Sequence, residues 1–220
     1  MTQTRGMDHL IMNDGGKATA LRQLQERGFE IPEFYVAHPD AKKPDILKSF
    51  DELFDDDVQV AVRSSAVGED GAEHSFAGQF ESYLFVQRQD VVARCHDVWN
   101  SGQSERVDAY RDERGAESAK PAALIQRMID PAAAGVAFSA DPVSGRRRIA
   151  IVSAVEGVGE KLVSGEADSD NFEVSSDGKI ETEATDSCLT DAQVRDVAQL
   201  ARSCEGAFGR PQDIEWAIDG

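Results

Sequence analysis

The stretch Val60-Ala-Val-Arg-Ser-Ser-Ala66, followed by Ser75-Phe-Ala-Gly-Gln79, is the most informative part of this chain. A short β-branched strand leads Arg63 into a serine-rich bend, and a loop of small residues follows that is flexible enough to lie against a ligand. A fixed positive charge beside backbone N–H donors is what a polyphosphate needs for binding. The two segments therefore predict a phosphate-binding site built around Arg63.

The same segments resemble the nucleotide-binding domain of the phosphoenolpyruvate synthase and pyruvate phosphate dikinase family, which rifampin phosphotransferase shares. The family carries Arg-Ser-Ser-Ala-x-x-Glu-Asp and then Ser-Phe-Ala-Gly-Gln, and this chain has Glu69-Asp70 at the matching place. The resemblance implies an α+β, ATP-grasp-like fold whose two lobes clamp ATP. It also implies that Arg63 contacts the phosphates and that the loop with Ser75, Ala77 and Gly78 closes over them. A surface salt bridge is the alternative role for Arg63.

The composition is that of a globular protein with an acidic excess. Of the 220 residues, 40% are hydrophobic and 29% are charged, and the formal net charge is −18. Such a charge argues against unaided binding of nucleic acid, which needs a basic footprint. No apolar run reaches the length that spans a bilayer, and the first residues lack the apolar core of a signal peptide. We therefore expect a cytoplasmic protein that binds neither nucleic acid nor membrane.

The three cysteines, Cys95, Cys188 and Cys204, show no C-x-x-C spacing. An odd number of cysteines without that spacing indicates neither a disulfide framework nor a zinc site. We expect buried or partly exposed thiols without a catalytic role.

Hydrophobic periodicity predicts helices and strands in both halves of the chain. The first half is expected to hold helices from Gly15 to Gly28, Pro44 to Phe54 and Asp90 to Arg114, and strands at 30–37, 58–62 and 82–86. The second half is expected to hold strands at 122–129, 134–140, 148–155, 172–174, 180–182 and 214–218, and a helix capped by Thr190. The polar stretch 115–120 predicts a boundary between an N-terminal lobe, 1–117, and a C-terminal lobe, 118–220.

Lys17 follows a Gly-Gly bend at the start of a predicted helix. Free N–H groups and the positive end of the helix dipole favour phosphate there, and the lysine adds a point charge. An isolated Gly-Gly-Lys is usually a plain helix start. The resembling family reads Gly-Gly-Lys-Gly-Ala-Asn-Leu, whereas Ala18 and Ala20 replace the third glycine and the asparagine here. The resemblance implies that Lys17 contacts the ATP phosphates.

The segment Ala123-Leu-Ile-Gln-Arg-Met-Ile129 resembles the family's strand at the adenine hinge. The resemblance implies that an exposed backbone edge pairs with the adenine rim and that Gln126, Met128 and Ile129 contact the base. Without the resemblance the segment is interpreted as a core strand.

Two further segments match the family in the second half. Gly135-Val-Ala-Phe-Ser-Ala-Asp-Pro-Val-Ser-Gly145 resembles Gly-Val-Leu-Phe-Thr-Ala-Asn-Pro-x-Thr-Gly, and the residues from Gly157 to Gly165 resemble Gly-Leu-Gly-Glu-x-Leu-Val-Ser-Gly. The resemblance implies that Gly157 and Gly159 let the backbone bend under the nucleotide and that Glu160 reaches the ribose or a metal ion. Either glycine alone would be only a turn signal.

The last match is Pro211-Gln-Asp-Ile-Glu-Trp216. The family uses this glutamate to hold magnesium against the phosphates, so the resemblance implies Glu215 as a metal ligand. Asp213 lies two residues earlier in the expected strand and shares its face, which makes it a second candidate ligand. A solvent-facing carboxylate is the alternative for Glu215.

The resemblance implies a phosphotransferase with ATP and Mg²⁺ as cofactors. Lys17, Arg63 and magnesium would be catalytic by neutralising charge while a phosphoryl group passes in line from ATP to a histidine. The final acceptor would be pyruvate or another compound. Two alternatives stay open: a non-catalytic nucleotide sensor or interaction module, and an ATP-grasp ligase.

None of the four histidines, His9, His38, His74 and His96, lies in the family's phosphohistidine motif. We also expect this chain to lack the family's strand with Gln-Ser-Arg-Pro, which follows Glu-Trp in the family. We therefore expect either further C-terminal domains or a separate partner that carries the histidine.

Overall fold

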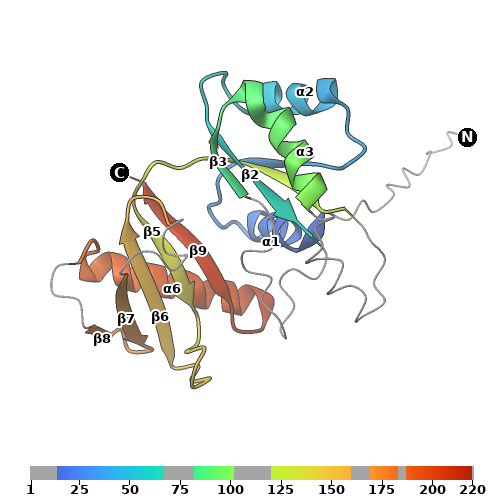
Figure 1. The fold of residues 1–220 in the computed structure, drawn as a ribbon. Helices are drawn as coiled ribbons and strands as arrows, with labels where there is room; N and C mark the ends of the chain where they lie inside the picture. The colour runs from blue at the N-terminus through green and yellow to red at the C-terminus, as the bar shows by residue number, and fades with distance from the viewer. Residues whose placement is uncertain (1–13, 67–81, 102–119, 160–168, 183–186, 220) are drawn as a thin grey trace, which may run out of the picture. The chain divides into compact units, whose positions relative to one another are not determined.

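The computed structural model describes residues 14–66, 82–101, 120–159, 169–182 and 187–219 (Figure 1). The chain forms two compact units that divide between Met128 and Ile129, and each unit contains one antiparallel sheet with at least one helix packed on it. This arrangement confirms the predicted α+β class.

The first unit contains a four-stranded sheet with the strand order β1-β4-β2-β3, in which all neighbours are antiparallel. Its elements are α1 (Gly15–Glu26), β1 (Phe34–Ala37), α2 (Lys43–Leu53), β2 (Val60–Ser65), β3 (Ser82–Val86), the 3-10 turn η1 (Arg88–Asp90), α3 (Val91–Ser101) and β4 (Ala122–Arg127). The predicted C-terminal lobe, 118–220, includes the segment of β4, whereas its hydrogen bonds to β1 and β2 make it a central strand of the first sheet. The predicted boundary at 117/118 lies outside the described residues.

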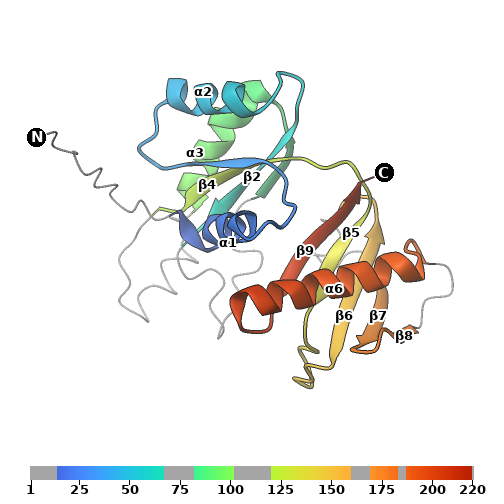
Figure 2. The same cartoon turned by 180° about the vertical axis from the view of Figure 1, so that it is seen from behind.

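Helices cover both faces of the first sheet, with α2 and α3 on one face and α1 on the other (Figures 1 and 2). Val60 and Val62 of β2 belong to the core under α2 and α3. Phe50 is fully buried in this core, and its ring meets Phe54 edge-on at a centroid distance of 5.2 Å. Because alternate residues of a strand point to opposite faces, Arg63 and Ser65 lie on the face that α1 covers.

The second unit contains a five-stranded antiparallel sheet with the order β8-β7-β6-β5-β9. Its elements are β5 (Pro131–Phe138), β6 (Ile149–Glu156), β7 (Asp170–Ser175), β8 (Ile180–Thr182), α6 (Asp191–Phe208) and β9 (Asp213–Asp219). The helix α6 lies across one face of this sheet (Figures 1 and 2). It is the only helix in the described part of this unit, so no described helix covers the opposite face.

Most expected elements of the second unit are confirmed. Thr190 caps α6 in a capping box, since its side chain accepts a hydrogen bond from the Gln193 backbone while the Gln193 side chain accepts one from the Thr190 backbone. The apolar stripe of α6 is buried against the sheet as its spacing predicted. In the first unit, the strand expected at 30–37 is shorter and begins at Phe34, two residues after Pro32, which has no N–H to donate to a ladder. The helix expected to reach Arg114 is described as far as Ser101.

The three cysteines are free thiols: Cys95 and Cys204 are buried and Cys188 is exposed. Burial raises the pKa of the Cys95 thiol to about 12, so this thiol is not ionised at neutral pH. None of the described helices is long and apolar enough to cross a membrane.

Candidate functional site

The N-terminal turn of α1 is attached directly to the end of β2. The backbone N–H of Ala18 donates a hydrogen bond to Ser65 Oγ at 3.1 Å, and the N–H of Gly16 donates one to the carbonyl oxygen of Ala66 at 2.9 Å. Ala18 and Ser65 are both almost completely buried. The structure thus joins the Gly-Gly-Lys motif to the Arg-Ser-Ser-Ala motif through two residues that are 47 positions apart in the sequence.

These hydrogen bonds correct one part of the sequence-based argument. We expected free N–H groups at the start of α1, ready to bind phosphate. The N–H groups of Gly16 and Ala18 are instead satisfied by acceptors of the protein itself. These two amides are therefore not available to a phosphate group. The first turn of α1 can attract phosphate through the Lys17 ammonium group and the positive end of the helix dipole.

Arg63 lies on the same face of the first sheet as the residues paired with it. It is half-buried and is paired with Leu124 of β4 and Ser82 of β3. Gln126 lies on this face as well, because its partner Ala61 is two residues from Arg63 on β2. Among the candidate residues, Arg63 and Gln126 therefore lie on the face of the sheet to which the Lys17 helix is attached.

The expectation of an exposed backbone edge for adenine is wrong for β4. This strand is paired on one side with β1 and on the other with β2. The pairing continues past its end, since the Arg127 N–H donates to Glu33 O at 2.8 Å and the Met128 N–H donates to Gln59 O at 2.9 Å. The N–H groups of Gln126 and Met128 are therefore engaged within the sheet, so a contact of these two residues with a base needs their side chains or carbonyl groups. The roles of Gln126, Met128 and Ile129 stay predictions.

The two candidate metal ligands lie on one face of β9. The strand alternates, with Ile214, Trp216 and Ile218 packed against the core beneath α6. Asp213 and Glu215 are exposed and point to the opposite face, as their spacing predicted. Two carboxylates on one open face fit a Mg²⁺ ion, which takes one or two protein carboxylates together with phosphate oxygens and water.

A row of residues crosses the face of the second sheet opposite α6 at the level of Glu215. Val136 of β5 is paired with Glu215 on one side and with Ser153 of β6 on the other, and Ser153 is paired with Asn171 of β7. The Ser153 hydroxyl donates a hydrogen bond to Asn171 Oδ1 at 2.6 Å. Ser153 and Asn171 are not among the predicted site residues, because the nearly continuous apolar sequence of β6 does not show which of its residues share a face with Glu215.

Gly157 and Gly159 follow β6 and contact the start of β5. Gly157 has a φ of +71°, which favours glycine, and its N–H donates to Ala132 O at 3.0 Å. A Cβ atom on Gly159 would lie 3.5 Å from the Cβ of Ala134, an ordinary contact. Ala134 lies on the same face as Val136, opposite α6, so Gly159 and Glu215 belong to one side of the second sheet.

Four other candidate residues, Ser75, Ala77, Gly78 and Glu160, lie outside the described residues. Their predicted roles in binding the nucleotide stay predictions. Among the described residues, no group of three or more His, Cys, Asp or Glu side chains could hold a metal ion.

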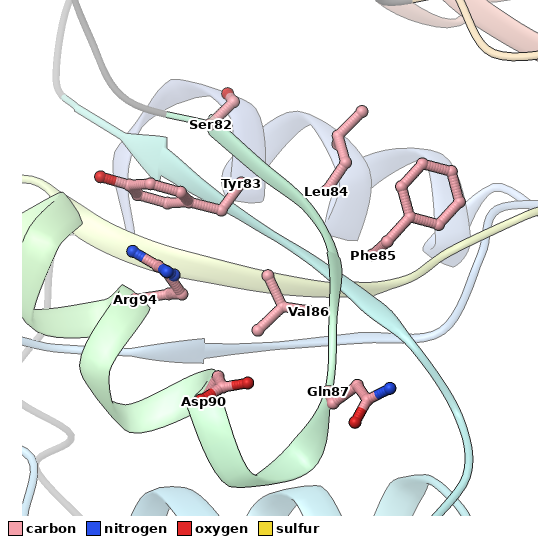
Figure 3. Close-up of a pocket in the computed structure, with 8 residues that line it drawn as sticks. All are labelled: Ser82, Tyr83, Leu84, Phe85, Val86, Gln87, Asp90 and Arg94. Carbon is pink, nitrogen blue, oxygen red and sulfur yellow. The ribbon is translucent and has the colours of Figure 1, made fainter.

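A separate pocket of about 440 Å³ lies along β3 and the start of α3 (Figure 3). Figure 3 shows Tyr83 beside Arg94, whose guanidinium carbon is 4.7 Å from the centre of the ring. Phe85, also in the lining, has a φ of +54° and is 43% exposed. None of the candidate site residues lines this pocket.

The sequence from residue 38 onward identifies the family of this chain. The model of the family described as pyruvate phosphate dikinase, AMP/ATP-binding domain, matches residues 38–181 and 176–220. This chain belongs to that family. The match includes Arg63, Gln126, Gly157 and Glu215, whereas Lys17 precedes its first residue.

Several relatives of this dikinase-type domain are similar over most of the chain. A rifampicin phosphotransferase of Bacillus subtilis (strain 168) is 34% identical over 194 residues, which cover 75% of this chain and 22% of that protein. The rifampicin phosphotransferase of Streptomyces sviceus is 37% identical over 187 residues, covering 72% of this chain and 21% of that protein. A probable phosphoenolpyruvate synthase of Pyrococcus horikoshii is 31% identical over 240 residues, covering 90% of this chain and 29% of that protein. The chain thus spans less than a third of the length of these relatives.

Among solved structures, the D-alanine-D-alanine ligase from Coxiella burnetii is similar to this dikinase-type domain with a TM-score of 0.48. The similarity covers 92% of this chain and 43% of that chain, at 9% sequence identity.

Proposed function

We propose that this chain is the ATP-binding domain of a dikinase-type phosphotransferase with an ATP-grasp fold. Its family is defined by an AMP/ATP-binding domain, and its relatives are named rifampicin phosphotransferase and probable phosphoenolpyruvate synthase. The phosphoryl group passes from ATP to a histidine on another domain or a partner, and from there to pyruvate or another acceptor. A cytoplasmic location is part of the same proposal.

One observation supports the ATP site most strongly, the attachment of α1 to β2. The hydrogen bond from Ala18 to Ser65 joins residues that are 47 positions apart in the sequence. Ala18 follows Lys17 directly and Ser65 lies two positions after Arg63, so this hydrogen bond brings the two cation-bearing segments of the backbone together. In a chain with a net charge of −18, such a joining of two cation-bearing motifs is what a polyphosphate site needs.

The proposal divides the binding of ATP and Mg²⁺ between two pairs of residues. Lys17 and Arg63 bind the phosphates, and Glu215, with Asp213, holds Mg²⁺. The metal ion supplies positive charge that offsets the charge of the phosphates when it is bound. Lys17 and Arg63 act in the same way from fixed positions, so the protein's contribution is orientation and charge neutralisation rather than covalent chemistry.

Calorimetric titration of the purified chain with the ATP analogue AMP-PNP, with and without Mg²⁺, tests this function. We expect magnesium-dependent binding, and we expect Lys17→Ala and Arg63→Ala each to weaken it by about 1–3 kcal/mol, the value of a lost charge-assisted hydrogen bond. Arg27→Ala is the matched control, because it removes an exposed cation from the other end of α1. Binding by both variants with the affinity of the wild type would show that the site is assigned wrongly.

A second experiment separates catalysis from binding alone. The chain is mixed with ATP and a phosphohistidine domain of a phosphoenolpyruvate synthase. A dikinase-type domain should phosphorylate that histidine and release AMP and orthophosphate, whereas binding without transfer would support the non-catalytic module. Formation of ADP together with a carboxylate–amine product would support the ligase.

A further inference from the structure

The start of α1 lacks the local cap that helices normally have. Asp14 occupies the cap position, but its side chain makes no capping hydrogen bond. Its carboxylate instead accepts a hydrogen bond from Arg22 Nε at 2.9 Å and lies 3.0 Å from His38 Nε2. The described side-chain acceptor for the first turn therefore comes from β2, through Ser65.

Ser65 is placed to hold the first turn of α1 in position, although its side chain is too buried to contact a ligand. It is 1% exposed, and its hydroxyl oxygen accepts the N–H of Ala18, which is itself fully buried. Arg63 precedes Ser65 by two residues and lies on the same face of the strand. The buried hydroxyl group of Ser65 thus connects β2, which carries Arg63, to α1, which carries Lys17.

We infer that Ser65 is a positioning residue for phosphate binding, acting through Lys17. Its hydrogen bond fixes the first turn of α1 against β2, and so fixes the distance between the Lys17 and Arg63 side chains at the phosphates. This inference rests on the proposed ATP-binding function. A purely structural role for Ser65 is the competing explanation, because any buried hydrogen bond contributes to stability.

A double-mutant cycle with Ser65→Ala and Lys17→Ala distinguishes the two explanations. If Ser65 acts through Lys17, Ser65→Ala weakens AMP-PNP binding about five- to tenfold in the wild-type background and less than about twofold in the Lys17→Ala background. The loss of stability in urea persists in both backgrounds. Binding of AMP, which lacks the β- and γ-phosphates, changes less than about twofold in Ser65→Ala.

The adjacent serine provides the matched control. Ser64 is 2% exposed and points to the other face of β2, so Ser64→Ala also removes a buried hydroxyl but should show no coupling to Lys17. If Ser65→Ala does not fold, Ser65→Cys carries the same test, because it keeps the size of the side chain and replaces the oxygen with a weak acceptor.

Each outcome decides the matter. Equal losses of AMP-PNP affinity in both backgrounds, or equal losses for AMP and AMP-PNP, would overturn the positioning role while leaving the ATP site intact. A wild-type chain that does not bind AMP-PNP would overturn the ATP site and the positioning role together. Coupling to Lys17 that is found for Ser65 but not for Ser64, and for AMP-PNP but not for AMP, would establish the positioning role of Ser65.

Discussion

Gly15 and Ser65 approach so closely that no side chain fits between them. A Cβ atom added to Gly15 would lie 2.2 Å from the carbonyl oxygen of Ser65. Gly15 also has a φ of +79°, a conformation that glycine adopts without strain. The first glycine of the Gly-Gly-Lys motif is therefore required by the packing of α1 on β2, whatever ligand binds there.

The variant Gly15→Ala should consequently destabilise the first unit. We expect a loss of about 3 kcal/mol or more, because a backbone clash adds to the strain of alanine at positive φ. Gly28→Ala separates these terms: Gly28 has the same φ of +79° but no atom within 4 Å of an added Cβ, so only about 1–2 kcal/mol should be lost. Urea unfolding measures both variants. Similar losses would contradict the close approach of α1 to β2.

Ala18 stands where the resembling family has a third glycine, and the structure gives it a helical role. It is fully buried inside α1. Ala18→Gly should lower the free energy of unfolding by about 1–2 kcal/mol, from helix propensity and the lost methyl group, and change AMP-PNP affinity less than about twofold. Thr19→Gly at the exposed neighbouring position should cost only about 0.5 kcal/mol. A clear gain of affinity in Ala18→Gly would show that the missing glycine limits the site.

The carboxylates of β9 should control the magnesium dependence of binding. We expect Glu215→Gln to remove most of the effect of Mg²⁺ on AMP-PNP affinity and Asp213→Asn to reduce it, because each variant loses a negative ligand without losing size. Asp219→Asn is the control, since Asp219 lies on the same exposed face of the same strand. Titrations at several Mg²⁺ concentrations give the result. If Asp219→Asn had the same effect as Glu215→Gln, general charge rather than a ligand would be responsible.

Asp141 should contribute to the acid sensitivity of the second unit. The Ser144 hydroxyl and the Val143 N–H donate hydrogen bonds to its carboxylate, and these lower its pKa from 3.8 to about 2. Because the folded pKa lies below the unfolded value, the stabilisation is complete above about pH 4 and is lost as the pH falls toward 2.

Urea unfolding between pH 5 and pH 2.5 checks this expectation. Asp141→Asn should be less stable than the wild type at pH 5, and the difference should shrink as the pH falls. Asp196→Asn, an exposed change on α6 that alters net charge equally, is the control. A difference between Asp141→Asn and the wild type that is the same at every pH would exclude the ionised carboxylate as its source.

Local patterns predicted the elements better than their partners. The capping residue and apolar stripe of α6, and the bounds of β3, follow from residues near one another in the sequence, and they were predicted correctly. The position of β4 in the first sheet was not predicted correctly. Its partners β1 and β2 precede it by long stretches of chain, and the local sequence of a strand does not show which strands pair with it.

The candidate site shows the same limit. The alternation of β9 was sufficient to place Asp213 and Glu215 on one face. The satisfied N–H groups of α1 could not be foreseen, because their acceptors on Ser65 and Ala66 lie far along the chain. Ser153 and Asn171 join the level of Glu215 only through the register of three strand pairs, which the sequence does not display.

The bulge at Phe85 has a consequence for how copies of this chain behave at high concentration. The register of β2 and β3 shifts between Val60 and Val62, opposite the residue with positive φ, and β3 is the edge of its sheet in the described topology. An interrupted edge cannot offer the regular row of donors and acceptors onto which a strand of another molecule would add. The positive φ of Phe85 and this register shift thus make the edge of β3 a poor template for the addition of another strand.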